Sequence, residues 1–225
     1  WLCRFLRRMG ASVEGESRGC VIIRGQKRLH GCTFQVPPDR IAAGTWILAG
    51  AAVRGAVELD RVPVEELETV LKVYRKMGGQ YRVSGDKLFT DSSRVGRAVP
   101  YVETESYPGF PTDLQSPLLA AAATLSGKTI VRETVFEDRF AAVRELRKMG
   151  ARTQIRGPLI EMEKSRLHGA QVAAGDLRGG AALVIAALAA EGNTEVEQVQ
   201  YIERGYERFP EQLQQLGARI RMIEE

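Results

Sequence analysis

Three short polar turns carry side chains that could bind an anion or move a proton. Each turn places an Asp directly before an alanine-rich stretch, at Pro38-Asp39-Arg40, Pro111-Thr112-Asp113 and Asp176-Leu177-Arg178. Asp or Thr at a helix N-terminus caps the free N–H groups of its first turn. The same N–H groups and the helix dipole can bind a phosphate or carboxylate. Capping is the commoner role for any one such Asp, so both readings stay open here.

The arginines in two of these turns favour the anion-binding reading. Arg40 and Arg178 gain little from the positive end of a helix, whereas a guanidinium pairs well with phosphate or carboxylate. We therefore expect both side chains to contact an acidic ligand. The excess of 32 basic over 28 acidic residues also suits an anionic ligand, but these charges are too scattered to indicate nucleic-acid binding.

The segment Tyr107-Pro108-Gly109-Phe110-Pro111-Thr112-Asp113 combines two prolines and a glycine around an aromatic residue. Such a loop is stiff and fixes the direction of the carboxylate that follows it. A general base must lie within hydrogen-bond reach of the proton that it removes. Asp113 is therefore our candidate base, and the alternative is an ordinary loop before a helix.

Other polar residues are weaker candidates. Arg204 opens the string Arg204-Gly205-Tyr206-Glu207-Arg208 and could bind an acidic ligand, whereas Glu207 and Arg208 suit a helix surface. His30 and His168 stand in two equivalent Leu-His-Gly turns, and this repetition indicates a structural role. The thiols, at Cys3, Cys20 and Cys32, have no neighbouring base in sequence.

A sequence repeat of about 70 residues indicates how these turns are positioned. Its marker is a pentapeptide ending at Gly10, Gly78, Gly150 and Gly217. In each unit an amphipathic helix is followed by Gly and then by short alternating segments typical of strands, including 80–83, 87–90, 128–131, 159–162 and 218–222. We therefore predict pseudo-threefold repeats.

Alanine-rich stretches, at Ile41 to Val53, Leu114 to Leu125 and Ala181 to Ala190, are apolar on all sides. Helices of this kind are buried on every face, so we place them together at the centre. The amphipathic helices and the sheets would then lie outside. The predicted fold class is α/β, an inside-out α/β barrel with buried alanine-rich helices and outer sheets.

Val36-Pro37-Pro38 is a natural break between domains. We expect residues 1–36 to be the tail of another domain and residues 37–225 to form the repeat domain. The first residue is Trp1 and falls inside a repeat, so we also expect a preceding segment. No stretch is long and apolar enough to predict a membrane helix, and the uneven thiol count indicates a reducing cytosol without a zinc site.

Several strings together resemble one known family, UDP-N-acetylglucosamine 1-carboxyvinyltransferase. They are Pro111-Thr112-Asp113-Leu114-Gln115, Glu133-Thr134-Val135-Phe136-Glu137-Asp138-Arg139, Met149-Gly150-Ala151, Gly169-Ala170, Asp176-Leu177-Arg178 and Arg204-Gly205-Tyr206-Glu207. The resemblance implies a cytoplasmic two-domain transferase without a cofactor or metal. It would move the enolpyruvyl group of phosphoenolpyruvate to the 3′-hydroxyl of UDP-N-acetylglucosamine and release phosphate. This is the first committed step of peptidoglycan synthesis, on which cell-wall biogenesis, cell shape and cell division depend.

The resemblance also implies roles for individual residues. Asp113 would contact the sugar hydroxyl and serve as its base, and Val135 would contact the UDP-sugar with Phe136 beside it. Arg178 and Arg204 would face the phosphate and carboxylate of phosphoenolpyruvate, with Asp176 nearby.

Some family features are missing from this chain. The reactive Cys and the Lys-Asn pair of the family lie upstream of residue 1, so we expect the chain alone to be inactive and to need an N-terminal half. Ser116-Pro117 replaces the usual continuation of the first string, and Glu203 stands where Asp is common. Two alternatives stay open: a non-catalytic nucleotide-sugar-binding module, and a relative of the RNA 3′-end-processing cyclases, which share a related repeat.

Overall fold

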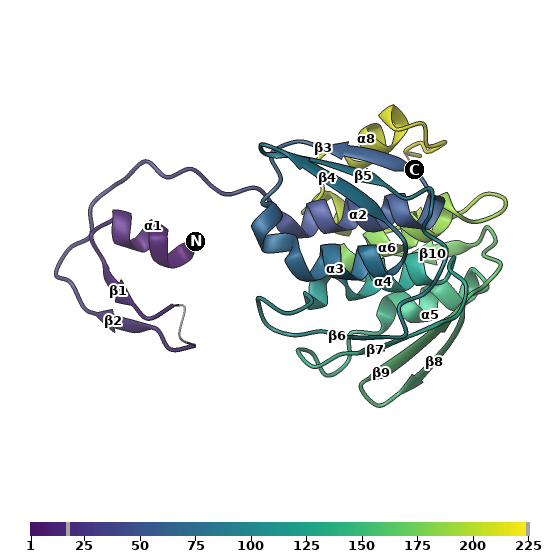
Figure 1. Ribbon diagram of the computed structural model, residues 1–225, viewed down its shortest axis with the longest axis horizontal. Coiled ribbons are helices and arrows are strands. Elements are labelled where there is room, and N and C mark those ends of the chain that lie inside the picture. The colour runs from purple at the N-terminus through teal and green to yellow at the C-terminus, as the bar shows by residue number, and fades with distance from the viewer. Residues whose placement is uncertain (17–18, 224–225) are drawn as a thin grey trace. The chain divides into compact units, whose positions relative to one another are not determined.

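The computed structural model describes residues 1–16 and 19–223, which divide into two compact units, Trp1–Pro38 and Asp39–Glu225. The first unit contains α1 (Leu2–Arg8), β1 (Ser12–Glu14) and β2 (Ile22–Arg24), with the two strands antiparallel (Figure 1). Val13 is buried, and the rings of Phe5 and Phe34 meet edge to face at 5.3 Å. None of the α1 residues is buried, and Ile22 and Ile23 of β2 are exposed.

The second unit alternates helices and strands. Its α-helices are α2 (Arg40–Val53), α3 (Glu68–Lys76), α4 (Gln115–Ala122), α5 (Ala141–Lys148), α6 (Leu177–Leu188), α7 (Gln200–Glu203) and α8 (Phe209–Gln215), with 3₁₀ turns η1 (Val64–Leu67) and η2 (Thr112–Leu114). Its strands are β3 (Ala56–Leu59), β4 (Gln80–Ser84), β5 (Lys87–Asp91), β6 (Tyr101–Glu103), β7 (Lys128–Arg132), β8 (Arg152–Arg156), β9 (Leu159–Glu163), β10 (Gln171–Ala173) and β11 (Glu195–Glu197).

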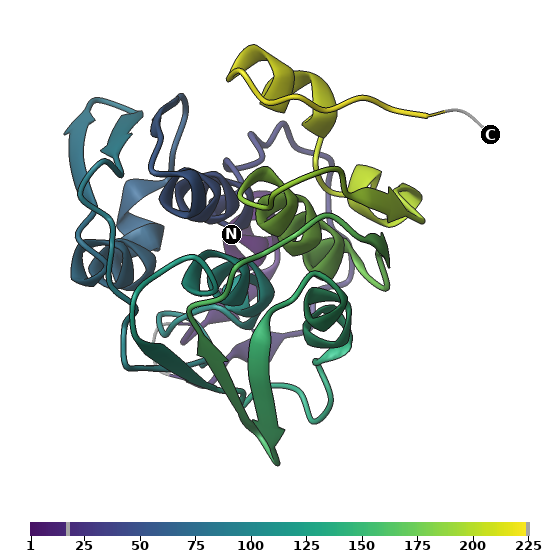
Figure 2. The ribbon, with the colours of Figure 1, turned by 90° about the vertical axis from the view of Figure 1, so that its right-hand side faces the viewer.

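The alanine-rich helices α2, α4 and α6 form the centre of this unit and contact one another in pairs. All eight residues of α4 are buried, as are most residues of α2 and α6. Seen end on in Figure 2, these three helices lie side by side, with the sheets around them. The prediction of central, buried alanine-rich helices in an α/β fold is therefore confirmed, because small side chains allow helices to pack on all sides.

The strands of the second unit form three separate sheets. One is antiparallel with the order β3-β5-β4, and another is mixed with the order β6-β7-β9-β8. In the mixed sheet β6 runs parallel to β7 and the other pairs are antiparallel. The third sheet is the short parallel pair of β10 and β11. Amphipathic helices α3 and α5 bury one face each, as their spacing predicts.

The strand predicted at 218–222 is wrong. These residues are all described and adopt no regular structure. A strand requires a neighbouring strand for its backbone hydrogen bonds, and here the carbonyl oxygen of Ile220 accepts instead from the side chain of Gln214, Nε2, at 2.6 Å. Alternating residues were therefore not sufficient to specify a strand at this position.

The two histidines sit in matching local structures, one in each unit. The backbone N–H of His30 donates to Met9 at 2.9 Å, and that of His168 donates to Met149 at 3.0 Å. Each ring lies against the glycine of its own repeat marker, Gly10 or Gly150. These shared contacts agree with the structural role expected for both histidines.

Close packing of α2 on the start of α4 depends on Gly44. A Cβ at this position would overlap the Cδ1 atom of Leu114. We expect Gly44→Ala to lower the free energy of unfolding by about 1–2 kcal/mol, because the overpacking cost exceeds the gain in helix propensity. Urea denaturation tests this, with the exposed Gly96→Ala as a control, since a Cβ there meets only Arg94 O at 4.0 Å. Equal stability of the two variants would show that Leu114 moves aside freely.

No described helix has both the length and the apolar character needed to cross a membrane.

Candidate active site

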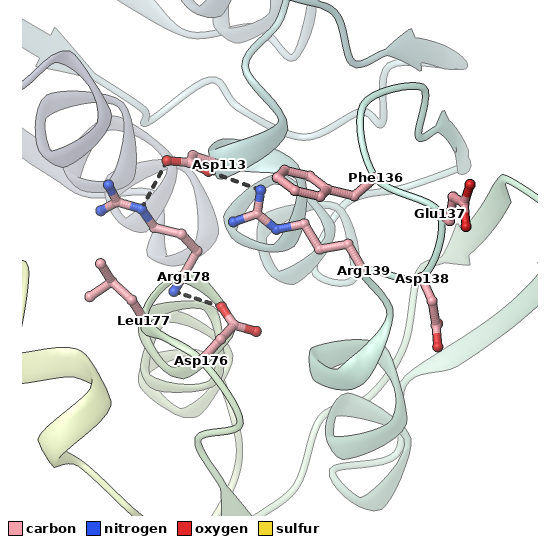
Figure 3. Close-up of a pocket in the computed structure, with 8 residues that line it drawn as sticks. All are labelled: Asp113, Phe136, Glu137, Asp138, Arg139, Asp176, Leu177 and Arg178. Carbon is pink, nitrogen blue, oxygen red and sulfur yellow. Dashed lines mark hydrogen bonds and ion pairs between the residues drawn. The ribbon is translucent and has the colours of Figure 1, made fainter.

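A surface pocket of about 460 Å³ brings together two of the three predicted polar turns (Figure 3). Its lining residues are Asp113, Phe136, Glu137, Asp138, Arg139, Asp176, Leu177 and Arg178. Asp113 comes from η2, the Phe136–Arg139 segment from the loop between β7 and α5, and the remaining three from the start of α6. The pocket therefore lies where two of the central helices begin.

The predicted base, Asp113, lies between two guanidinium groups. Its Oδ1 atom is 2.9 Å from Nη1 of Arg139, and its Oδ2 atom is 3.4 Å from Nε of Arg178. Figure 3 shows the carboxylate bridging these two side chains. The Asp113 side chain remains 37% exposed, so it is paired and still open to solvent. A carboxylate held in one orientation beside a pocket can accept a proton from a ligand that binds there.

Arg178 is the more buried of the two arginines, with 13% of its side chain exposed. Burial disfavours the charged form, but Tyr206, Asp113 and Asp39 outweigh this effect and raise the pKa of Arg178 above its ordinary value. Its guanidinium stacks over the Tyr206 ring at 5.3 Å. Arg178 is therefore a permanent cation, and in this structure it is engaged by Asp113 and Tyr206.

The three candidate Asp residues have different roles in the structure. Asp39 caps α2 by accepting from Ile41 N at 2.7 Å, and Asp176 caps α6 by accepting from the N–H groups of Arg178 and Gly179. Both are thus helix caps, although Asp176 also lines the pocket. Asp113 makes no cap bond and instead forms the ion pairs described above.

Arg139, like Glu137, Asp138 and Leu177, lines the pocket although the sequence alone assigns it no role. Besides Asp113, its Nη1 atom contacts the hydroxyl of Thr112 at 3.1 Å, and its guanidinium lies 5.0 Å from the centre of the Phe136 ring. Its side chain is 19% exposed. Arg139 belongs to one of the strings that resemble the transferase family, but only the fold shows that it reaches Asp113.

Glu133 is a second residue that the sequence did not single out. It directly follows β7 and is 2% exposed, which is unusual for a charged side chain. Its carboxylate accepts hydrogen bonds from the backbone N–H groups of Val135 and Phe136, at 2.9 and 3.2 Å. It thereby holds the loop that carries both predicted sugar contacts. The side chains of Val135 and Phe136 are exposed, and Phe136 lines the pocket.

Arg40 and Arg204, the other two predicted cations, are not among the described residues that line this pocket. Arg40 is the first residue of α2, and its guanidinium stacks over Tyr107 at 5.2 Å. Arg204 follows α7 and is exposed, two residues before the Tyr206 that contacts Arg178. The described residues contain no cluster of three or more His, Cys, Asp or Glu that could hold a metal ion.

Comparison with solved structures defines the class of protein. The chain superposes on the enolpyruvyl transferase NikO from Streptomyces tendae with a TM-score of 0.84 and 29% identity, over 96% of this chain and 52% of that one. An EPSP synthase from Acinetobacter baumannii gives a TM-score of 0.71 at 20% identity, over 98% and 55%, which shows the fold alone. The α/β fold is thus that of the enolpyruvyl transferases.

Sequence comparison shows the family. A sequence model described as EPSP synthase (3-phosphoshikimate 1-carboxyvinyltransferase) matches residues 1–213, and the chain belongs to this family. Within it, relatives named UDP-N-acetylglucosamine 1-carboxyvinyltransferase are 44% identical in Thermus thermophilus and 43% identical in Desulfofundulus thermocisternus. The alignments cover 99% and 97% of this chain, and 52% and 90% of those relatives. The chain therefore spans about half the length of the Thermus relative.

Proposed function

We propose that this chain supplies the Asp113 side of a UDP-N-acetylglucosamine 1-carboxyvinyltransferase. The observation that carries the proposal is the Asp113 carboxylate, held between Arg139 and Arg178 in an open pocket. Identities of 40–46% to transferases of this name support the choice of substrates. The reaction would belong to peptidoglycan precursor synthesis in the cytoplasm, and thus to cell-wall biogenesis, cell shape and cell division.

In the proposed reaction, Asp113 accepts the proton of the sugar 3′-hydroxyl as its oxygen attacks C2 of phosphoenolpyruvate. A general acid of the closed site adds a proton to C3 and so completes a tetrahedral intermediate that carries both phosphate and carboxylate. The conjugate base of that acid then takes a proton from C3 as inorganic phosphate leaves, and the carboxyvinyl ether remains on the sugar. Fixed cations stabilise an anionic intermediate of this kind in a closed site. We propose Arg178 as one such cation, with Arg204 and Arg40 as further cations and Asp176 as a neighbouring carboxylate.

We further propose that the UDP-sugar contacts Val135 and Phe136. Both are exposed on a loop that Glu133 anchors, and Phe136 borders the same pocket as Asp113. A ligand lying on this loop would place its reactive hydroxyl near the carboxylate. No metal or cofactor has a part in this mechanism.

The finer architecture is also part of the proposal. We propose an inside-out barrel built of pseudo-threefold repeats, and we assign residues 1–36 to the tail of a second domain. The matching environments of His30 and His168 support a common repeat in the two units. The exposed apolar residues of the first unit, including Ile22 and Ile23, support a missing packing partner. That partner would be an N-terminal half that carries the reactive Cys, and the chain alone would be inactive.

Restoring the missing half tests the function. We expect a fusion of this chain to the upstream half of the Thermus thermophilus relative to release phosphate when both phosphoenolpyruvate and UDP-N-acetylglucosamine are present. Each half alone is the control and should release none. A well-folded fusion without activity would contradict the proposal.

Two binding measurements on the chain alone, calorimetry with UDP-N-acetylglucosamine and retention of RNA at increasing salt, separate the two alternatives. Strong binding of UDP-N-acetylglucosamine without the other half would favour a non-catalytic binding module, whereas salt-sensitive retention of RNA would favour an RNA 3′-end-processing relative. We expect neither, because sites of this kind lie between domains.

A further inference from the structure

The buried carboxylate of Glu133 accepts five hydrogen bonds from three segments of the second unit. Oε1 accepts from Thr104 Oγ1 at 2.9 Å and from the backbone N–H groups of Val135 and Phe136. Oε2 accepts from Thr112 Oγ1 at 2.9 Å and from Gln115 Nε2 at 3.1 Å. Thr112 and Gln115 flank Asp113 in sequence. Glu133 therefore joins the turn that carries the candidate base to the loop that carries the candidate sugar contacts.

The hydroxyl of Thr112 links Glu133 to the pocket. A hydroxyl has one proton to donate and lone pairs to accept with. Thr112 uses its proton toward Oε2 of Glu133, so its oxygen faces Arg139 as an acceptor, at 3.1 Å from Nη1. The same Nη1 atom carries a second proton and lies 2.9 Å from Oδ1 of Asp113. Because a guanidinium only donates and a carboxylate only accepts, the Thr112 hydroxyl must donate to Glu133 and accept from Arg139.

From this order of donors and acceptors, we infer that Glu133 and Thr112 are positioning residues that aim Arg139 at Asp113. We call Glu133, Thr112, Arg139 and Asp113 the Glu133 network. Neither Glu133 nor Thr112 is among the residues that line the pocket. Their effect on turnover rests on the function proposed above, whereas their effect on Arg139 does not.

The positioning role inferred for Thr112 depends on its hydroxyl group. A valine has nearly the same shape as threonine but no hydroxyl, so Thr112→Val breaks the link and leaves the Glu133 bonds to the 133–136 loop in place. Thr112→Ser keeps the hydroxyl and should preserve the link. Thr129→Val is the matched control, because the Thr129 hydroxyl is buried in β7 without a hydrogen-bond partner among the described residues.

Nitrogen-15 NMR of arginine side chains in this chain tests the positioning directly, with the Arg139 signal assigned by its loss in Arg139→Lys. A guanidinium held by an ion pair and a hydroxyl rotates slowly and gives resolved Nη signals. We expect these signals in the unmodified chain and in the Ser and Thr129→Val variants, and averaged signals in Thr112→Val and Glu133→Gln. Unchanged Arg139 signals in Thr112→Val would overturn the inference.

Kinetics of the fusion provide the second readout. We expect Thr112→Val to lower kcat about tenfold, with the KM for UDP-N-acetylglucosamine changed by about twofold or less, because Thr112 helps to orient the base and does not itself line the pocket. Thr112→Ser, which keeps the hydroxyl, should have the same kcat as the unmodified fusion. A rise in KM alone would contradict the positioning role. An inactive unmodified fusion would reject the proposed function, and the NMR result would still decide the positioning of Arg139.

Discussion

Replacing Asp113 with Asn in the fusion should reduce kcat by about 10²–10⁴, which is the usual contribution of a general base. The amide has the shape of the carboxylate but cannot accept the hydroxyl proton. It also cannot pair with both Arg139 and Arg178, which contact opposite oxygens of Asp113. Phosphate release measured at saturating concentrations of both substrates gives kcat directly.

Asp60→Asn is a suitable control for this substitution. Asp60 also forms an ion pair, with Lys87 at 2.9 Å, but it belongs to the exposed surface beside the β3-β5-β4 sheet. Its loss should leave kcat unchanged. Thermal unfolding of each variant will separate a loss of chemistry from a loss of folded protein. Normal turnover by a folded Asp113→Asn variant would remove Asp113 from the mechanism.

The largest effect on stability is expected for Leu118→Ala in α4. Leu118 is completely buried in the helix that contacts both α2 and α6. Removing its side chain leaves a cavity in the centre of the unit, and we expect the free energy of unfolding to fall by about 2–5 kcal/mol. Because the pocket residues are held at the ends of α4 and α6, the same variant should lose substrate turnover near its lowered melting temperature.

Trp46 provides the signal for this measurement. It lies in α2 beside Phe209, with ring centres 5.1 Å apart, and Trp1 is the second tryptophan of the chain. A Trp1→Phe background therefore leaves Trp46 to report unfolding of the second unit in urea. Leu216→Ala is the control, since Leu216 is exposed and its removal should change stability by about 0.5 kcal/mol or less. A similarly small change for Leu118→Ala would contradict burial of α4.

Features that depend on local composition could be predicted from the sequence. The alanine-rich stretches form helices within a few residues of their expected bounds, because an apolar run of small side chains suits only a buried helix. Pro117 does not interrupt α4, since it falls in the first turn, where a missing N–H is tolerated. The capping positions of Asp39 and Asp176 also follow from local sequence.

Features that depend on contacts between distant residues could not be predicted in this way. Arg139 and Asp113 are 26 residues apart, and only the packing of α5 and α6 around α4 brings their loops together. Glu133 looked like one charge among several in its string, and its burial is a property of the folded sheet. The residues at 218–222 alternate like a strand but have no strand beside them, so pattern alone misled the prediction there.

The prediction that Arg178 binds an anion also shows the limit set by contacts between residues distant in sequence. Its position at a helix N-terminus made a bound phosphate or carboxylate the natural partner. In the structure that partner is the carboxylate of Asp113, and Figure 3 shows the terminal nitrogens of Arg178 pointing away from Arg139. The contact of Arg178 with a phosphate or carboxylate of a ligand stays a prediction, and its ion pair with Asp113 could not be foreseen from the sequence.

Acceptor choice is the most direct test of the reaction assigned to this pocket. Mass spectrometry of a single mixture can follow the fusion with phosphoenolpyruvate, UDP-N-acetylglucosamine and shikimate 3-phosphate together. We expect the carboxyvinyl group to appear on the UDP-sugar and to be absent when Asp113 is replaced by Asn. A carboxyvinyl group on shikimate 3-phosphate would contradict the proposed reaction. The same amount of carboxyvinyl UDP-sugar from the Asp113→Asn variant as from the unmodified fusion would contradict the role of Asp113.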